Sequence, residues 1–277
     1  RTEHDFNALT DLLLRLHYDF DYLDEDILAG AAIEDGAICV AGERFELLIL
    51  PPLTHLKEST VTAMEKFVAG GGKLLGTIFL PGQAFGAAGL TNVEARMEAL
   101  FGVNPTWSQA ERARHPEITV ATRSHANGGT TCFLRTYALA RQLPWQLQSQ
   151  FGAAGQPEHP CFMIEKVGDE NHYYCWVGDG RRVEITSEVL AERTEVADAL
   201  EKALNRLVAP DIVIDNRELF SLHRVKDEQD LYFLVNPTQR SQRATVALPG
   251  GWRPSIWDPA TGDQRPVAPV TQVDGFT

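Results

Sequence analysis

Five carboxylates gather near the start of the chain, at Asp19, Asp21, Asp24, Glu25 and Asp26. Carboxylate oxygens coordinate Ca²⁺ and accept hydrogen bonds from sugar hydroxyls. Helix capping and solvation in a loop explain such a cluster equally well. Residues 18–22 alternate aromatic and acidic side chains, which predicts a strand, and the carboxyl ends of strands line the ligand crevice of α/β sheets. Asp19 and Asp21 are therefore the acidic residues that we expect nearest to a substrate.

One histidine stands at a comparable place. His55 comes just after Pro51-Pro52, where a predicted strand ends, so its imidazole could reach a bound group. A lone histidine at such a position is more often a hydrogen-bonding residue of a loop or a helix start. The remaining histidines show neither i, i+4 pairs nor a shared spacing with carboxylates, so the sequence predicts no zinc site.

Tryptophan side chains stack on sugar rings where they are exposed, and they pack in cores or interfaces more often than that. The chain has five of them, at Trp107, Trp145, Trp176, Trp252 and Trp257. Trp252 and Trp257 are the better candidates for substrate binding because they fall in the part of the chain that reads as short strands.

Other patterns that carry chemistry are missing. The four cysteines, Cys39, Cys132, Cys161 and Cys175, contain no C-x-x-C pair and read as buried free thiols, although a Cys161–Cys175 disulfide stays open for a periplasmic or secreted protein. Gly70-Gly71-Gly72 is followed by a strand, the reverse of the order in a phosphate-binding loop, and reads as a helix stop. We identify no catalytic residue, no metal site and no cofactor site.

The elements that must position these residues begin with a strand, helix, strand unit. The run over 45–50 is almost continuously apolar, which indicates a strand buried on both faces, as in a parallel sheet covered by helices. A helix over 58–69 and a second buried strand over 73–79 follow. Such a unit, with a right-handed crossover helix, is the building block of doubly wound α/β folds.

The character of the chain changes after a long helix that we expect over 187–208 and that Pro210 ends. Short strands separated by turns take over from there. The pattern predicts an α/β domain with a flavodoxin-like parallel sheet over 1–209, followed by a smaller all-β sandwich over 210–277. The strands of that second part are too few for a complete sandwich.

The formal net charge of −13 argues against a nucleic-acid partner, because phosphate binding requires clustered Lys and Arg. No stretch approaches the roughly 18 apolar residues of a membrane helix, so we expect no membrane partner. The chain starts at Arg1 without an initiator Met or a signal peptide, and we expect that a segment precedes it.

Three local patterns together resemble a known family. The block from Phe45 to Pro52, the helix after it and Gly70–Leu75 resemble the core of class I glutamine-amidotransferase-like domains, as in the trimerisation domain of some β-galactosidases. Residues 18–23 with 37–40 are similar to the region downstream of the catalytic barrel in bacterial α-L-rhamnosidases of glycoside hydrolase family 106. Residues 222–224, 230–237 and 257–262 resemble the β-domain that follows in those enzymes.

The resemblance implies a part of an enzyme without its catalytic machinery. In a glutamine amidotransferase, a Cys nucleophile follows the third strand, but Leu50-Pro51-Pro52-Leu53 stands there in this chain. The two carboxylates of a glycosidase would lie on a (β/α)₈ barrel upstream, in the same polypeptide. We therefore expect a non-catalytic accessory portion of a larger glycoside hydrolase, acting as scaffold, oligomerisation element or substrate rim.

Two other classes of function remain open. The chain could be a stand-alone carbohydrate-binding or oligomerising protein, or an enzyme whose site lies in the poorly periodic region 123–160. The expected partners are the upstream catalytic barrel, a carbohydrate such as an α-L-rhamnoside, and further copies of the chain. The resemblance favours a periplasmic or secreted location over a cytoplasmic one.

Overall fold

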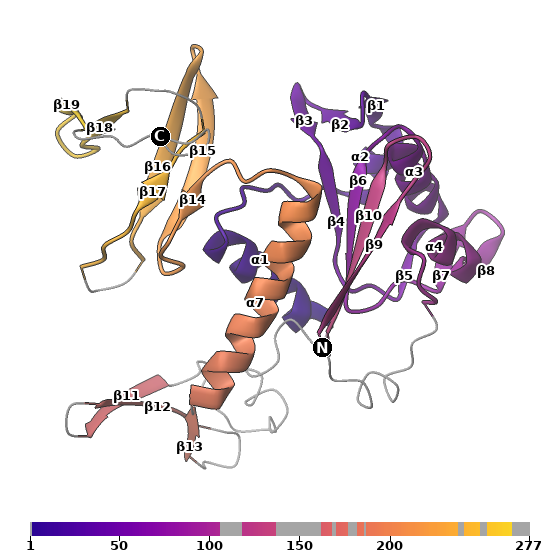
Figure 1. Cartoon of the computed structure of the whole chain (residues 1–277). Coiled ribbons are helices and arrows are strands. Elements are labelled where there is room, and N and C mark those ends of the chain that lie inside the picture. The colour runs from indigo at the N-terminus through magenta and orange to yellow at the C-terminus, as the bar shows by residue number, and fades with distance from the viewer. Residues whose placement is uncertain are drawn as a thin grey trace. The chain divides into compact units, whose positions relative to one another are not determined.

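The computed structural model describes residues 2–105, 118–136, 162–167, 170–176, 182–185, 187–237, 241–249 and 254–267. The chain forms two compact units (Figure 1). Unit 1 contains residues 1–10 and 22–208, and unit 2 contains residues 11–21 and 209–277. The division that the sequence suggests, at 209/210, keeps residues 11–21 in the first domain, whereas the structure groups them with unit 2.

A four-stranded sheet forms the centre of unit 1, in the order β4 (Leu47–Leu50), β6 (Lys73–Thr77), β10 (Thr130–Arg135) and β9 (Thr119–Ser124). β4, β6 and β10 are parallel, and β9 is antiparallel to β10. The expected α/β class with parallel strands is therefore confirmed. Its finer assignment as flavodoxin-like or amidotransferase-like stays a prediction.

Helices cover both faces of this sheet (Figure 1). α3 (Glu58–Ala69) and α4 (Glu94–Phe101) share one core cluster with Leu74 and Phe133. Side chains alternate between the faces of a strand, so the buried Leu75 and Leu134 point to the other face, where α7 (Ser187–Leu207) contacts β6, β9 and β10. Burial on both faces explains why the two central strands, β6 and β10, carry uninterrupted runs of uncharged side chains.

The glycine run after α3 ends the helix, as expected. Gly70 is the C-cap residue, and Gly71 has a φ of 95°, which a residue with a side chain rarely adopts. Gly72 allows a close approach, because a Cβ at this position would overlap the ring of the fully buried Phe67. The three glycines therefore turn the chain from α3 into β6 directly beneath a core aromatic residue.

Smaller elements complete unit 1. α2 (Glu25–Gly30) precedes an antiparallel sheet of β1 (Ala32–Glu34), β2 (Ala37–Val40) and β3 (Glu43–Phe45), and a turn at Asp35-Gly36 joins its first two strands. A second three-stranded sheet, which the sequence did not predict, contains β5 (His55–Lys57), β7 (Gln83–Gly86) and β8 (Gly89–Asn92). β11 (Phe162–Val167), β12 (Glu170–Trp176) and β13 (Arg182–Ile185) form a third, antiparallel sheet.

Unit 2 contains three two-stranded antiparallel sheets among its described residues. They pair β14 (Val213–Ile214) with β17 (Val246–Ala247), β15 (Phe220–Lys226) with β16 (Gln229–Val235), and β18 (Ser255–Trp257) with β19 (Gln264–Pro266). The described strands support an all-β region, and the sandwich itself stays a prediction.

The segment 11–21 joins unit 2 through specific contacts. It starts in the last part of α1 (Thr2–Arg15), where the Arg15 guanidinium lies 5.7 Å from the centre of the Phe220 ring. Nε2 of His17 lies 3.1 Å from the carbonyl oxygen of Leu219. The strand predicted over residues 18–22 is wrong, because these residues are irregular. His17, with a φ of 61°, ends the helix in the left-handed region, and the chain continues without a pairing strand.

Candidate functional site

The acidic residues 24–26 have structural roles. The Asp24 carboxylate caps α2 by accepting a 2.8 Å hydrogen bond from the Asp26 N–H. The Glu25 carboxylate accepts hydrogen bonds from the Lys57 N–H and the Thr60 hydroxyl, at 2.7 Å and 2.6 Å, and so caps α3, whose own N-cap residue makes no side-chain cap. Asp26 forms a 2.7 Å ion pair with Lys57, and this hydrogen bond raises the pKa of Lys57. Helix capping therefore accounts for Asp24 and Glu25, and an ion pair accounts for Asp26.

Asp19 and Asp21 lie in the irregular segment of unit 2. Asp19 accepts a hydrogen bond from the Phe20 N–H at 3.0 Å and one from Nη1 of Arg224, on β15, at 2.9 Å. Asp21 is exposed. Neither residue stands at the end of a strand, so the geometric reason for expecting them at a substrate is lost. A sugar contact at these two residues stays a prediction.

His55 holds two parallel strands together. Its Nδ1 lies 2.9 Å from the Thr54 hydroxyl, and its Nε2 lies 2.9 Å from the side-chain oxygen of Gln83, its register partner on β7. The ring also stacks on Phe85, with the centroids 5.5 Å apart. Both ring nitrogens of His55 are engaged. The arrangement therefore favours a structural role for His55, as a hydrogen-bonding residue at a strand end, over contact with a bound group.

Trp257 is the predicted site residue whose surroundings suit a ligand best. It lies on β18 opposite Gln264 and is 52% exposed. The adjoining turn is well ordered by hydrogen bonds, because the Asp258 carboxylate accepts from the Ala260 N–H at 2.8 Å and the Asp258 N–H donates to the Asp263 carbonyl at 2.9 Å. An exposed indole beside an amide is typical of surfaces that bind sugar rings. Trp252 lies outside the described residues.

The densest group of titratable side chains in the described part of unit 2 surrounds His223 on β15. Its Nδ1 lies 2.7 Å from Asp211 and its Nε2 lies 2.9 Å from Asp230. The imidazole stacks on the ring of Tyr232, its register partner on β16, at 4.2 Å between centroids and an interplanar angle of 7°. The Tyr232 hydroxyl donates a 3.3 Å hydrogen bond to Asp211. We call these four residues the His223 cluster.

The contacts of the His223 cluster suit a structural role rather than a catalytic one. Carboxyl groups on two sides engage both ring nitrogens of His223. With both nitrogens held in these contacts, neither is available to bind a metal ion or to take a proton from a substrate. Burial, assisted by the charges of Asp211 and Asp230, raises the pKa of Tyr232, so this phenol stays protonated. The cluster ties residue 211 to the β15–β16 hairpin.

Sequence reasoning missed this cluster although a signal for it exists. The two strands of the hairpin meet at Asp227-Glu228, and both turn residues have a positive φ. Pairing outward from a two-residue turn places His223 opposite Tyr232, and on the same face as Asp230. Asp211 is remote in sequence, so its contribution has no local signal.

The ends of the parallel strands carry no reactive thiol among the described residues. β4 ends at Leu50, whose carbonyl oxygen accepts a 3.2 Å hydrogen bond from the Thr77 hydroxyl. β6 is followed by Ile78, a buried residue with a φ of 63°. Cys132 lies within β10, and burial raises the pKa of its thiol, which disfavours the reactive thiolate.

Within the described residues, no three His, Cys, Asp or Glu side chains lie close enough together to hold a metal ion. None of the helices in the described part of the chain is both long and apolar enough to cross a membrane.

No family model matches the chain, and no curated protein matches it. Solved structures that are similar to 95% of the chain include Gan42B, a GH42 β-galactosidase (15% identity, TM-score 0.39). A catalytic mutant of Gan42B from G. stearothermophilus gives 15% identity and a TM-score of 0.42. α-L-Fucosidase isoenzyme 2 from Paenibacillus thiaminolyticus gives 16% identity and a TM-score of 0.41.

All three structures are of glycoside hydrolases. The chain spans 33%, 34% and 43% of their respective lengths.

Proposed function

We propose that this chain is a non-catalytic accessory portion of a larger glycoside hydrolase, where it acts as scaffold, oligomerisation element or substrate rim. The observation that carries the proposal is the use made of its titratable groups. In the described residues, the nitrogens of His55 and His223 are all engaged in holding strands together. Glu25 caps a helix across the fold, and Asp19 pairs with Arg224.

The pairing of carboxylates points the same way. A glycosidase needs one carboxyl group on each side of a glycosidic bond, with room for the sugar between them. Asp211 and Asp230 are held on the two sides of the His223 ring, so the imidazole fills that space. The geometry favours fold stabilisation over hydrolysis at this place.

The resemblance to family 106 enzymes supports an upstream barrel in the same polypeptide and α-L-rhamnosides as substrates, and a periplasmic or secreted location. Trp257 is then the residue that would reach a sugar. Its indole offers an apolar face to a pyranose ring, and Gln264 offers an amide donor and acceptor beside it. A second candidate, a stand-alone carbohydrate-binding protein, rests on this same surface.

Hydrolysis assays on the purified chain test the proposal. We expect no turnover of aryl α-L-rhamnosides, β-galactosides or α-L-fucosides, and turnover when the complete reading frame is expressed. Hydrolysis by the 277-residue chain itself would refute the proposal.

Calorimetry with rhamnosides and galactosides separates the accessory role from the stand-alone binder. Binding by the chain alone, in the millimolar range or tighter and lost in Trp257→Ala, would favour the binder. Ile256→Ala is the matched control, because Ile256 is the exposed neighbour on the other face of β18. A chain that binds neither sugar leaves the accessory role as the better account.

A further inference from the structure

The hairpin of β7 and β8 presents an uncharged surface on a strongly charged protein. Residues 74–93 contain no Asp, Glu, Lys or Arg, although the chain as a whole is 23% charged. The β6 residues of this stretch are buried in the core, whereas much of the β7–β8 hairpin is exposed to solvent. Phe85 is 59% exposed and Leu90 is 49% exposed. The hairpin stands at the outer side of unit 1 (Figure 1).

Phe85 and Leu90 form one patch. They are direct register partners, and Gln83 and Asn92, the next pair on the same face, are exposed as well. The opposite face carries Ala84, which is buried and belongs to the core cluster. We call Gln83, Phe85, Leu90 and Asn92 the hairpin face.

β8 is also an edge strand in the part of the chain that the structure describes. It pairs only with β7 among the described strands, as the last strand of the order β5-β7-β8. The Val93 N–H donates to the Gly82 carbonyl oxygen at 2.9 Å, which fixes the alternation of the ladder. The N–H and C=O groups of Leu90 and Asn92 consequently point away from β7. Natural edges are usually blunted by Lys, Pro or a bulge, and Gly89–Asn92 has none of these.

We infer that β8 pairs with β8 of a second copy of this chain, antiparallel about a two-fold axis at Thr91. The charge of the chain favours a second copy as the partner of β8. Two chains of net charge −13 repel each other, and a two-fold contact places a surface against itself, so it is tolerated where that surface carries no charge. The hairpin satisfies this requirement. An uncharged edge also forms no ion pairs with a charged partner, which disfavours such a partner at this edge.

The register follows from the groups that face the free edge. If Leu90 lies opposite Asn92 of the second copy, both residues of each chain donate and accept across the axis. Thr91 then faces its own copy as a non-hydrogen-bonded pair, with Cα atoms about 4.5 Å apart. The two sheets become one continuous sheet, and the hairpin faces join into an uncharged stripe in which Leu90 of each copy lies beside Asn92 of the other.

Sedimentation of the purified chain measures the self-association. A contact through one short strand is small, so we expect a dimer with a dissociation constant of about 10–100 µM. Leu90→Lys places a charge at the edge and should weaken the dimer at least about tenfold. Leu234→Lys is the matched control, since Leu234 is 48% exposed on β16 and lies far from β8 in the chain. A chain that stays monomeric at about 500 µM, a trimer, or equal effects of the two variants would overturn the inference.

Cysteine cross-linking tests the register independently of affinity. The spacing of about 4.5 Å expected at Thr91 falls within the range for a disulfide. Thr91→Cys should therefore form a covalent dimer on oxidation, above the background given by the wild-type chain and by Ala88→Cys at the hairpin tip. Equal cross-linking of Thr91→Cys and Ala88→Cys would exclude the register.

This inference rests on the proposed function and specifies which strand would provide its oligomerisation role. The two proposals can fail separately, because the glycoside assays decide whether the chain is catalytic and sedimentation decides whether β8 pairs.

Discussion

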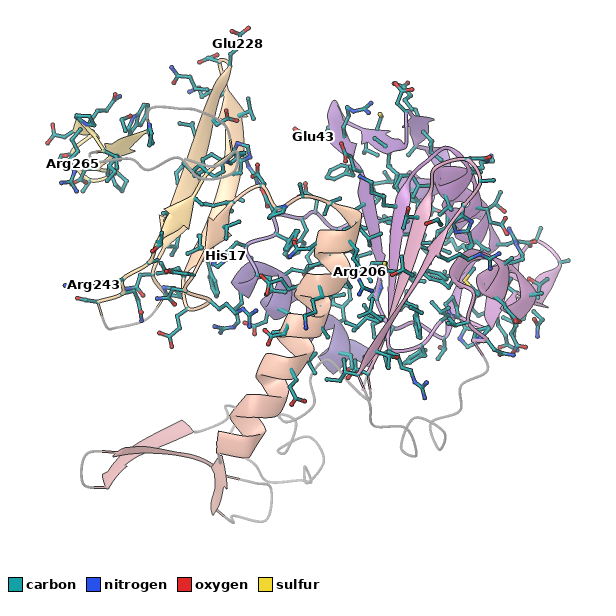
Figure 2. All side chains as sticks on the ribbon, viewed as in Figure 1. His17, Glu43, Arg206, Glu228, Arg243 and Arg265 are labelled. Carbon is teal, nitrogen blue, oxygen red and sulfur yellow. The ribbon has the colours of Figure 1, made fainter. Side chains whose placement is uncertain are left out.

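The parallel sheet of unit 1 and the β15–β16 hairpin of unit 2 start from similar sequence and reach different environments. Leu47–Leu50 and residues 231–235 are both unbroken runs of apolar side chains. In unit 1, Leu50 is buried, residues 47–49 are half-buried, and Leu74 and Leu75 of the neighbouring strand β6, which helices cover, are fully buried. In unit 2, Phe233, Leu234 and Val235 remain about half exposed. Figure 2 labels Glu228 at the turn of this hairpin. An apolar run therefore predicts a strand, whereas its burial depends on what covers the strand.

The two regions also differ in what holds them together. The unit 1 sheet is stabilised mainly by apolar burial, which scales with area and requires no particular partner. The hairpin of unit 2 depends more on directed contacts, those of the His223 cluster, of Arg15 with the Arg217 carbonyl, and of Arg224 with Asp19. Isolated two-stranded sheets are marginal in water, so such contacts matter more there.

The sharpest way to break this comparison is to remove one phenylalanine from each region. Phe67→Ala should lower the free energy of unfolding by about 3–5 kcal/mol, because Phe67 is 0% exposed and Gly72 beneath it has no side chain to fill the cavity. Phe233→Ala, at 53% exposure, should cost less than about 1 kcal/mol. Urea unfolding of each variant measures the difference, and similar losses would show that the hairpin is packed as firmly as the core.

The same contrast decides what the sequence could reveal. The helix at 58–69, its glycine stop and the strands beside it were predictable, because period, burial and capping all agree there. β7 and β8 were not, because Gln83–Asn92 is rich in glycine and alanine and lacks the β-branched alternation that marks strands. The strand predicted over 18–22 had the right alternation, but the left-handed end of α1 at His17 leads the chain into an irregular segment.

The candidate site divides in a similar manner. Trp257 could be singled out, because its residue type alone suggests sugar binding and its exposure agrees. The His223 cluster could be found only in part, since the hairpin register joins His223, Asp230 and Tyr232, whereas Asp211 arrives through the fold. For Glu25, the sequence is compatible with a ligand or with a helix cap, and the chain folds it onto the start of α3, where backbone N–H groups need an acceptor.

Replacing His223 sharpens the comparison with an intermediate effect. His223→Phe keeps an aromatic ring against Tyr232 but removes both ring nitrogens and leaves Asp211 and Asp230 facing an apolar ring. We expect a loss of about 1–2 kcal/mol, because the cluster is partly exposed. Hydrogen exchange should show β15 and β16 amides exchanging about tenfold faster, while β6 and β10 remain protected. The control is His55→Phe in unit 1, whose solvent-exposed hydrogen bonds should matter less. Unchanged exchange in the hairpin would mean that the cluster contributes little.

The smallest expected effect concerns pH and again separates the two regions. Burial raises the pKa of Tyr232 above its ordinary value of 10.0, and the carboxylates of Asp211 and Asp230 act in the same direction. Below about pH 10 the phenol is protonated in the folded and the unfolded chain alike, so titration leaves stability unchanged. Above that pH the phenol of the unfolded chain loses its proton first, which favours unfolding, and stability falls.

Tyr232→Phe cannot titrate, so its unfolding free energy should decline less than that of the wild-type chain between about pH 9 and pH 11. Urea unfolding across that interval measures both slopes, and parallel slopes would show that the surroundings of Tyr232 do not hold its proton. Because the phenol lies against Asp211 and Asp230 and not in the apolar core, a difference confined to the hairpin amides in hydrogen exchange would locate the titration in unit 2.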